Sequence, residues 1–428
     1  MEPVERLCDF LRGASGYAVL RNPDVVSNLV RGGDVDLLVQ NIHSFSKNLL
    51  KSAGSPLMYM NRSYVHGFFW AWGHVDLLPT IEWHGAVFVD TKKILEKALL
   101  NSFGLSEASL PYQAVISWFA SLLWGGFFKM RYRDVIVQAA REHERELFQI
   151  LEHAVGSLWA RRLLEAAQAG RPEDSVNWVG ALRRVLWWRA FRRAPLATVK
   201  GWVRFWFREI MLRIEPPVLW IAVLGPDGSG KSTLLQALKQ RLGRGRPFLE
   251  VRIFHWRPGR IGGGKASGPV TDPHGEPPRG FLASCAKVGL LAIDWVLGYW
   301  LDLAHLRAKG ILVAFDRHYV DLLVDPKRYR YGGPMKFAEF IGHWIPRPDL
   351  FIILDLPAEV AHARKPEVPL EEARRLRERY LKLGASLPKA YVVDASRPLE
   401  EVEADVVDLI LRHMASRTAQ RIRGLGLC

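Results

Sequence analysis

An eight-residue stretch, Gly225-Pro-Asp-Gly-Ser-Gly-Lys-Ser232, constrains this 428-residue chain more than any other feature. It fits the G-x-x-x-x-G-K-[ST] pattern of a phosphate-binding loop. The apolar run Val218–Leu224 before it is typical of a buried parallel strand, and Thr233–Leu242 after it has the pattern of a helix. Strand, glycine-rich turn and helix in this order are the context that the pattern requires. We therefore expect an α/β domain that binds a phosphorylated ligand.

The residue types within this loop fit phosphate chemistry. Its glycines let backbone N–H groups converge on phosphate oxygens, and the N-terminus of the following helix adds a favourable dipole. Lys231 can bridge the β- and γ-phosphates of a nucleotide, and the Ser232 hydroxyl can ligate Mg²⁺. The cofactors that we expect are therefore ATP and Mg²⁺. The candidate cofactor-binding residues are Gly225, Asp227, Gly228, Ser229, Gly230, Lys231, Ser232 and Thr233.

The chain after Pro216-Pro217 alternates strands with helices, which predicts a parallel sheet flanked by helices over residues 216–428. The predicted strands include Val251–Phe254 and the runs ILVAFD, LFIILD and YVVDA. A helix near Leu282–Leu306 is long enough to span a membrane. However, Lys287, Asp294 and Asp302 interrupt it, and each would cost about 2.5–3.5 kcal/mol near the bilayer centre. We expect this helix to be mostly buried within the protein.

Four sequence features of this part of the chain resemble the thymidylate kinase-like nucleoside monophosphate kinases, over about Val218 to Leu411. The first is the loop GPDGSGKST. The second is Phe254-His-Trp-Arg-Pro-Gly259 after the second strand, which resembles the family's Arg-Pro-Gly-type segment near the acceptor phosphate. The third is Asp316-Arg317 at the end of ILVAFD. The fourth is PDLFIILDLPAEVAHARKPE, which contains Arg364 and resembles the strand leading to the lid, together with Tyr391–Ser396, which resembles the segment behind the adenine.

The resemblance implies transfer of the ATP γ-phosphate to an acceptor. It places Asp316 near Mg²⁺ or the acceptor, Arg317 on an acceptor phosphate, and Arg364 as a lid arginine that offsets charge on the transferred group. The catalytic candidates are Lys231, Asp316, Arg317 and Arg364, with Ser232 and Asp316 as metal ligands. The family's base-reading Asp-Arg-x-x-His motif is absent from AIDWVLGYW. The acceptor therefore stays open among nucleotides, sugars and other small molecules.

A second constellation lies near the N-terminus. In Arg31-Gly-Gly-Asp-Val-Asp-Leu-Leu-Val39, side-chain alternation along a strand puts Asp34 and Asp36 on one face. Asp76 follows in the apolar frame His74–Leu78, and three such carboxylates can hold divalent metals. Residues 1–103 resemble the DNA polymerase β-type nucleotidyltransferases, with an α+β fold and Asp34, Asp36 and Asp76 as metal ligands. Nucleotidyl transfer at this site is the alternative activity, and an ATP-binding regulatory module without turnover is a third.

Residues 104–215 form the third predicted part, a helical domain with basic, Trp-rich helices at its end. Leu182–Ile214 carries nine Arg or Lys residues and one acidic residue. Lys200, Arg204 and Arg208 recur every fourth residue in one stripe. A second stripe is formed by Val199, Trp202, Trp206 and Ile210. The stripes fit three alternatives: packing of the Trp face on the helical domain, contact with an anionic membrane surface, and contact with nucleic-acid backbone.

The overall composition limits the kinds of partner that this protein can have. A formal net charge of +15 predicts contact with something anionic, although it does not say what. Cys8, Cys285 and Cys428 lie far apart with no CxxC pair, which disfavours a disulfide scaffold and a thiolate zinc site. The N-terminus shows no secretory h-region. We expect a cytoplasmic protein, peripheral to a membrane if the basic helices bind one, with a small-molecule acceptor and not nucleic acid as its partner.

Overall fold

The computed structural model describes residues 2–21, 24–30, 33–62, 65–243, 247–261 and 274–427. It divides into two compact units. Unit 1 comprises Met1–Ile210 with Thr418–Cys428, and unit 2 comprises Met211–Arg417. Two helices, α10 (Pro195–Ile214) and α18 (Leu399–Gly424), contain the points at which the chain passes from one unit to the other. The expected three-part division, with boundaries after residues 103 and 215, stays a prediction.

Unit 2 is built on a five-stranded sheet in the order β11-β12-β10-β13-β14, and every neighbouring pair is parallel. Its strands are β10 (Trp220–Leu224), β11 (Glu250–His255), β12 (Ile311–Asp316), β13 (Leu350–Asp355) and β14 (Ala390–Asp394). The apolar runs of the sequence predicted these strands, because a parallel strand covered on both faces needs no polar alternation. The predicted parallel sheet flanked by helices is confirmed.

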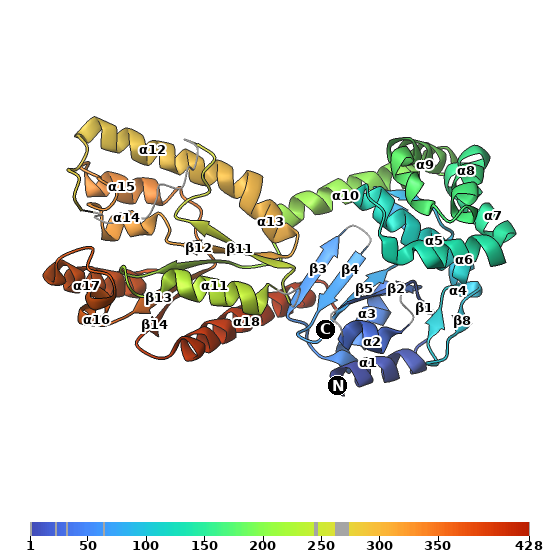
Figure 1. Ribbon diagram of the computed structural model, residues 1–428, viewed down its shortest axis with the longest axis horizontal. Helices are drawn as coiled ribbons and strands as arrows, with labels where there is room; N and C mark the ends of the chain where they lie inside the picture. Colours follow the sequence, from blue (N-terminus) through green and yellow to red (C-terminus); the bar gives the residue numbers. More distant parts are fainter. Residues whose placement is uncertain are drawn as a thin grey trace. The chain divides into compact units, whose positions relative to one another are not determined.

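Helices cover both faces of this sheet. Figure 1 shows α12 and α15 on one side of the sheet and α11 and α18 on the other, so the strands are enclosed. The helices of unit 2 are α11 (Lys231–Leu242), α12 (Phe281–Gly298), the π-helical turn Tyr299–Leu303, α13 (Ala304–Ala308), α14 (Val320–Val324), α15 (Met335–Gly342), α16 (Ala358–Arg364) and α17 (Leu370–Ser386). Trp220, Trp295 and Phe315 are fully buried at the centre of its core.

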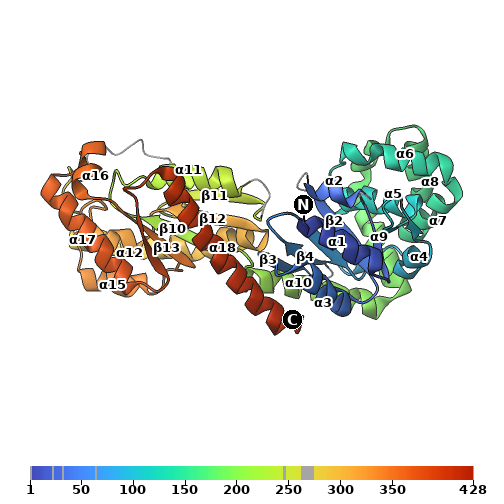
Figure 2. The same ribbon diagram turned by 90° about the horizontal axis from the view of Figure 1, so that it is seen from below.

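The expectation that the long helix is mostly buried is wrong. Only 33% of the apolar window within Phe281–Ala308 is buried, and by length and composition this segment could cross a membrane. Two of its three charged side chains turn toward the protein, and the third is partly exposed. Asp294 is fully buried, Lys287 reaches the carbonyl of Tyr329, and Asp302 pairs with Arg260. The outward positions are apolar, and α15 packs beside the helix (Figures 1 and 2).

Unit 1 contains a seven-stranded mixed sheet in the order β3-β4-β5-β2-β1-β9-β8, and a separate hairpin of β6 and β7. The strands are β1 (Tyr17–Val19), β2 (Asp34–Val39), β3 (Met58–Arg62), β4 (Val65–Phe69), β5 (His74–Leu78), β6 (Glu82–Trp83), β7 (Ala86–Val87), β8 (Leu99–Leu100) and β9 (Ser106–Glu107). Strands β2 and β5 are parallel, with Asp36 directly opposite Asp76. This register brings the second candidate constellation together.

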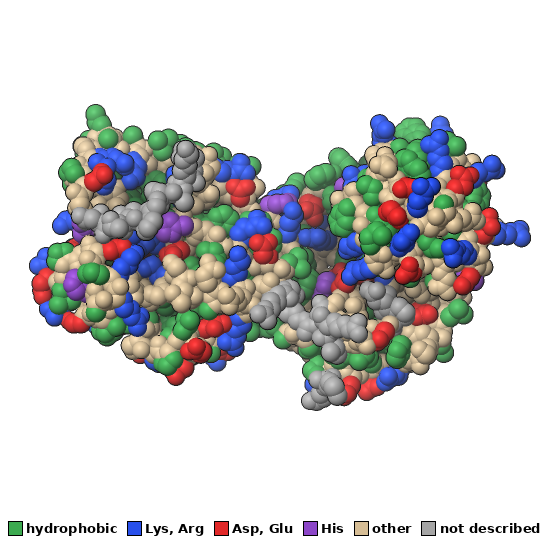
Figure 3. All heavy atoms as spheres, viewed as in Figure 1, with side chains coloured by type: hydrophobic (Ala, Val, Ile, Leu, Met, Phe, Trp, Pro, Cys, Tyr) green, Lys and Arg blue, Asp and Glu red, His purple; other side chains and the backbone are tan. Residues whose placement is uncertain are grey.

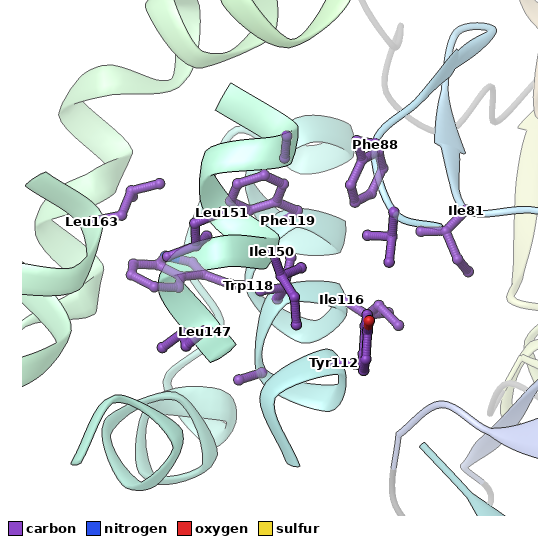
Figure 4. Close-up of a cluster of buried hydrophobic side chains, with 14 of the residues drawn as sticks. Ile81, Phe88, Tyr112, Ile116, Trp118, Phe119, Leu147, Ile150, Leu151 and Leu163 are labelled. Atoms are coloured by element: carbon purple, nitrogen blue, oxygen red, sulfur yellow. The ribbon is translucent and has the colours of Figure 1, made fainter. Parts of the chain in front are cut away.

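The two faces of this sheet contribute to different cores. Alternate side chains of β1 and β2, such as Val19 and Leu37, pack with α1, α3 and the end of α18, whereas Ala18 and Leu38 belong to the core of the helical region. Figure 4 shows part of that second core, in which Trp118, Phe119, Leu147 and Leu151 meet between helices. The helices of unit 1 before α10 are α1 (Glu2–Gly13), α2 (Val25–Val30), α3 (Ile42–Ala53), α4 (Thr91–Glu96), α5 (Leu110–Phe119), α6 (Arg133–Glu142), α7 (Glu144–Val155), α8 (Ser157–Gln168) and α9 (Val179–Arg193).

Candidate active site

The loop Gly225–Ser232 connects β10 to α11 at the carboxyl edge of the parallel sheet. Gly225, Gly228 and Gly230 have φ values of 142°, 81° and 90°, in the region that favours glycine. A Cβ on Gly228 would lie 2.5 Å from the carbonyl oxygen of Ala361, so the loop passes against α16 at a distance that only glycine allows. No side chain caps the N-terminus of α11. Its first backbone N–H groups therefore remain suited to an anion.

Lys231 is held inside the loop. Its Nζ donates to the carbonyl oxygens of Gly225 at 2.9 Å and Pro226 at 2.8 Å, and the side chain is only 6% exposed. Burial lowers the pKa of the Lys231 ammonium to about 8, and the positive charge of Arg317 acts in the same direction. A bound phosphate would favour the charged form instead. The ammonium is therefore placed to neutralise phosphate charge.

Ser232 and Asp316 meet at the base of the loop. Val223 lies opposite Asp316 in the parallel register of β10 and β12, so both chain segments end at the same edge. The Ser232 hydroxyl donates to Asp316 Oδ2 at 2.7 Å, while Asp316 Oδ1 is buried with no hydrogen-bond partner among the described atoms. A hydroxyl and a carboxylate oxygen are hard ligands of the kind that Mg²⁺ prefers. These two predicted metal ligands therefore fit Mg²⁺.

Arg317 is a buried cation in an unusual backbone conformation. Its φ is +74°, and its backbone N–H donates to the carbonyl of Val223 at 3.0 Å. The guanidinium forms ion pairs with Asp227 and Asp321 and donates to the Tyr380 hydroxyl at 3.3 Å. Burial alone would lower the pKa of Arg317, but Asp321 and its other neighbours raise it. Left-handed backbone at a non-glycine residue is costly and is found disproportionately at functional sites.

Asp227 brings a second guanidinium to the loop. It forms ion pairs with both Arg317 and Arg328, and Arg328 also lies 3.6 Å from Glu367. Burial would raise the pKa of Asp227, but the surrounding cations lower it. Arg328 belongs to a short basic run, Lys327, Arg328 and Arg330, a pattern that is typical either of a solvated surface or of a site for an anionic acceptor. The structure places it at the phosphate loop, whereas Lys327 is exposed.

The segment after β11 lies against the end of β12. The backbone N–H of Trp256 donates to the carbonyl of Asp316 at 2.9 Å. The buried carboxylate of Asp294 accepts from the N–H of Gly259 at 3.1 Å and of Ile261 at 2.6 Å. Asp294, from the sequence AIDWVLGYW, thus fixes the predicted acceptor segment Phe254–Gly259. Sequence reasoning gave it no such role.

Sequence reasoning also missed Asp321, and the structure leaves the predicted Arg364 without a hydrogen bond or ion pair to the described residues of the loop. Asp321 is completely buried and accepts from Arg317, Tyr329 and Tyr380, so it anchors the guanidinium. Its spacing of four residues from Arg317 was the available signal. Arg364 is exposed at the end of α16, one helical turn beyond Ala361, and makes no hydrogen bond or ion pair within the described part of the chain.

The N-terminal carboxylates occupy a different environment. Asp36 is buried and ion-paired with Arg21, and burial is the main cause that raises its pKa. Asp76 accepts a hydrogen bond from His74 Nε2 at 2.8 Å. Burial would raise the pKa of Asp76, but His74 lowers it. Asp34 lies next to them on β2. Among the described residues, no three His, Cys, Asp or Glu side chains are grouped as a metal site, and the role of these carboxylates as metal ligands stays a prediction.

The phosphate loop, the Ser232–Asp316 pair and the buried Arg317 on a parallel sheet define a P-loop phosphotransferase. No model of a known protein family matches the chain. The chain is 32% identical over 209 residues to a protein named "Probable thymidylate kinase" of Pyrobaculum aerophilum, which covers 45% of this chain and 96% of that protein. It is 33% identical over 214 residues to the protein of the same name from Pyrobaculum calidifontis, covering 46% and 98%.

A bacterial relative gives the same result. The "Thymidylate kinase" of Neisseria meningitidis strain Z2491 is 29% identical over 215 residues, covering 45% of this chain and 97% of that protein. The chain belongs to the thymidylate kinase family. It is an ATP-dependent phosphotransferase, a nucleotide kinase at the level of the family. The aligned lengths are close to that of unit 2, and the relatives leave the remaining half of the chain without a counterpart.

Proposed function

We propose that the chain transfers the γ-phosphate of ATP to the phosphate of a nucleoside monophosphate, with Mg²⁺, and that dTMP is the first acceptor to test. The observation that carries this proposal is the hydrogen bond between Ser232 and Asp316, with Arg317 as the next residue in the chain. This hydrogen bond places the two candidate ligands of Mg²⁺ beside Arg317, a cation that can bind the acceptor. The names of the relatives support dTMP as the acceptor.

Each side chain then has a task in the transfer. Lys231 neutralises charge on the β- and γ-phosphates. Ser232 and Asp316 would hold Mg²⁺, which would supply further positive charge beside these phosphates. Arg317 and Arg328 converge on the carboxylate of Asp227. A phosphate offers a guanidinium the same kind of partner, so these two arginines can hold the acceptor phosphate. An oxygen of the acceptor phosphate attacks the γ-phosphorus, and the bond between the γ-phosphorus and the bridging oxygen breaks, so that this oxygen leaves with ADP.

The exposed Arg364 supplies the last positive charge in this proposal. It is the last residue of α16, the helix that the loop contacts at Ala361, so a small movement of the last turn of this helix would carry its side chain toward the nucleotide. Arg364→Ala should lower kcat about 10²-fold with little change in KM for dTMP, because a charge that acts in the transition state affects kcat most. Arg375→Ala, at an arginine of α17 that is 69% exposed, is the control. Equal effects of the two substitutions would remove Arg364 from the mechanism.

The acceptor is tested with γ-labelled ATP and a panel of dTMP, dUMP, dCMP, AMP and sugar phosphates. Arg317→Lys keeps a positive charge but loses the bidentate fork, so we expect KM for the acceptor to rise about tenfold or more, with KM for ATP nearly unchanged. Transfer to a sugar phosphate in preference to every nucleotide would reject the proposed acceptor class. An equal rise in both KM values would reject the role of Arg317.

A second candidate function is nucleotidyl transfer in unit 1. The observation that favours it is the register of β2 and β5, which puts Asp36 opposite Asp76 with Asp34 on the same strand. Three neighbouring carboxylates could hold metals if Arg21 moved away from Asp36. Arg31 and Gly32, which belong to the same motif, lie outside the described residues. Transfer of label from the α position of ATP that is lost in Asp36→Asn but kept in Lys231→Met would support this function.

A further inference from the structure

Helix α10 has an apolar face that is exposed to solvent. Leu196 is 88% exposed, Val203 53%, Phe207 55% and Ile210 52%. At 100° per residue these side chains lie within one arc of the helix, and Val199, Trp202 and Trp206, each more than 40% exposed, extend the same arc. Apolar side chains gathered in one patch are uncommon on a monomeric soluble protein and mark an interaction surface.

The opposite side of α10 holds the helix on unit 1. A Cβ on Gly201 would lie 2.7 Å from the Cα of Gly85, so the helix and the turn of the β6–β7 hairpin are in close backbone contact. The Phe205 ring stacks on His84 with centroids 4.2 Å apart. The packing side therefore consists of small and aromatic residues outside the Trp stripe. The interpretation that the Trp stripe packs on the helical domain is wrong, because that stripe faces solvent.

Basic side chains border this apolar face. Lys200 and Arg204 are exposed along one edge of it, and Arg204 also reaches Glu82 of the hairpin at 3.0 Å, which fixes its direction. On α9, the exposed Trp188 lies under the guanidinium of Arg192 at 5.5 Å. Figure 3 shows hydrophobic and basic side chains side by side over α8 and α9. Apolar and basic side chains thus alternate over this surface, while the surrounding sequence has one acidic residue, Glu209.

We propose that α10 docks unit 1 on the surface of an anionic lipid bilayer, with its apolar face among the lipid headgroups and its basic edge on their phosphates. An anionic bilayer buries the exposed apolar side chains and attracts the neighbouring basic ones. Water solvates the basic side chains well, but it leaves the apolar ones exposed. Tryptophan suits this boundary because its ring is apolar and its N–H is polar. This assignment is independent of the acceptor of the kinase.

The test is flotation of the full chain with vesicles of phosphatidylcholine containing about one quarter phosphatidylserine, beside vesicles of phosphatidylcholine alone. The wild type should float with the anionic vesicles, and the bound fraction should fall when NaCl is raised from about 0.1 M to about 0.5 M. The double substitution V203E/F207E should weaken binding roughly tenfold or more. Lys200→Glu should weaken it by roughly five-fold or more. A far-ultraviolet circular dichroism spectrum and a thermal unfolding curve like those of the wild type serve as the check on folding for each variant, because the kinase site lies in unit 2 and the substituted residues lie in unit 1.

Matched variants distinguish the other occupants of this face. Leu100→Glu introduces a negative charge at a leucine of β8 that is 78% exposed, and it should leave flotation unchanged. The proposal would be overturned if the wild type did not float with the anionic vesicles, or if V203E/F207E floated with them to the same extent as the wild type. So would loss of flotation in Leu290→Glu on α12 with retention in V203E/F207E. A concentration-dependent dimer that only V203E/F207E abolishes would assign the face to a second copy of the chain instead.

Discussion

The hydroxyl of Ser232 donates a 2.7 Å hydrogen bond to Asp316, a residue 84 positions further along the chain. The parallel register of β10 and β12 makes this contact, since it brings the end of each strand to the same edge of the sheet. The two candidate metal ligands are therefore positioned by the sheet and not by a flexible segment.

Removing either member of the pair should weaken the use of Mg²⁺. We expect Ser232→Ala and Asp316→Asn each to raise the Mg²⁺ concentration that gives half-maximal γ-phosphate transfer by roughly tenfold. The double substitution should cost less than the two single effects combined, because the residues contact each other. A titration of activity against Mg²⁺ measures all three. Ser386→Ala, a hydroxyl at the end of α17, is the control, and an unchanged Mg²⁺ requirement in Ser232→Ala would contradict the assignment.

Arg317 should be essential for the stability of unit 2. Substitution by Met leaves Asp321 and Asp227 without their main cation, and an uncompensated buried charge costs about 3–5 kcal/mol. Denaturant unfolding of the full chain should show this loss. Arg412→Met removes an arginine that is 78% exposed in its pair with Asp408, and it should change the free energy of unfolding by less than about 1 kcal/mol. Similar losses in the two variants would show that the Arg317 network is not stabilising.

Asp294 should control the segment between Arg257 and Ile261. Asn has only one acceptor oxygen, so Asp294→Asn cannot reproduce the bonds that both carboxylate oxygens accept from Gly259 and Ile261. We expect faster limited proteolysis of this segment and a several-fold rise in KM for the acceptor, with kcat less affected. Glu339→Gln on α15 changes an exposed carboxylate outside this segment and serves as control. A lower kcat at unchanged KM would separate this segment from acceptor binding.

The buried His66 should make unit 1 sensitive to acid. Burial lowers its pKa from 6.5 to about 4, and Arg208 acts in the same direction. His66 therefore stays neutral in the folded protein, whereas in the unfolded chain it binds a proton below about pH 6.5. The free energy of unfolding thus decreases as the pH falls from 6.5 toward 4. Between pH 7.5 and pH 5 the wild type should lose about 1–2 kcal/mol more than His66→Gln, in which the amide can still bond to Tyr59. Equal pH slopes in the two proteins would contradict this.

Local pattern predicted most of unit 2. The strands were visible as apolar runs, and Lys231, Ser232 and Asp316 were identifiable because their positions are tied to the ends of those strands. Asp294 and Asp321 were not identified, because a buried carboxylate acquires its role only when distant backbone and side chains reach it. The outward direction of the Trp stripe on α10 was also unpredictable. The stripe periodicity shows that two faces exist, and only the contact between Gly201 and Gly85 decides which one is buried.

The proposal that unit 2 transfers the γ-phosphate of ATP to a nucleoside monophosphate is tested by following label from γ-labelled and α-labelled ATP in parallel, with Mg²⁺, dTMP and the acceptor panel. The account predicts transfer from the γ position to a nucleoside monophosphate. It also predicts a loss of at least about 10²-fold in Lys231→Met and near-wild-type transfer in Asp36→Asn. Full γ transfer in Lys231→Met, or label that moves only from the α position and is lost in Asp36→Asn, would contradict it.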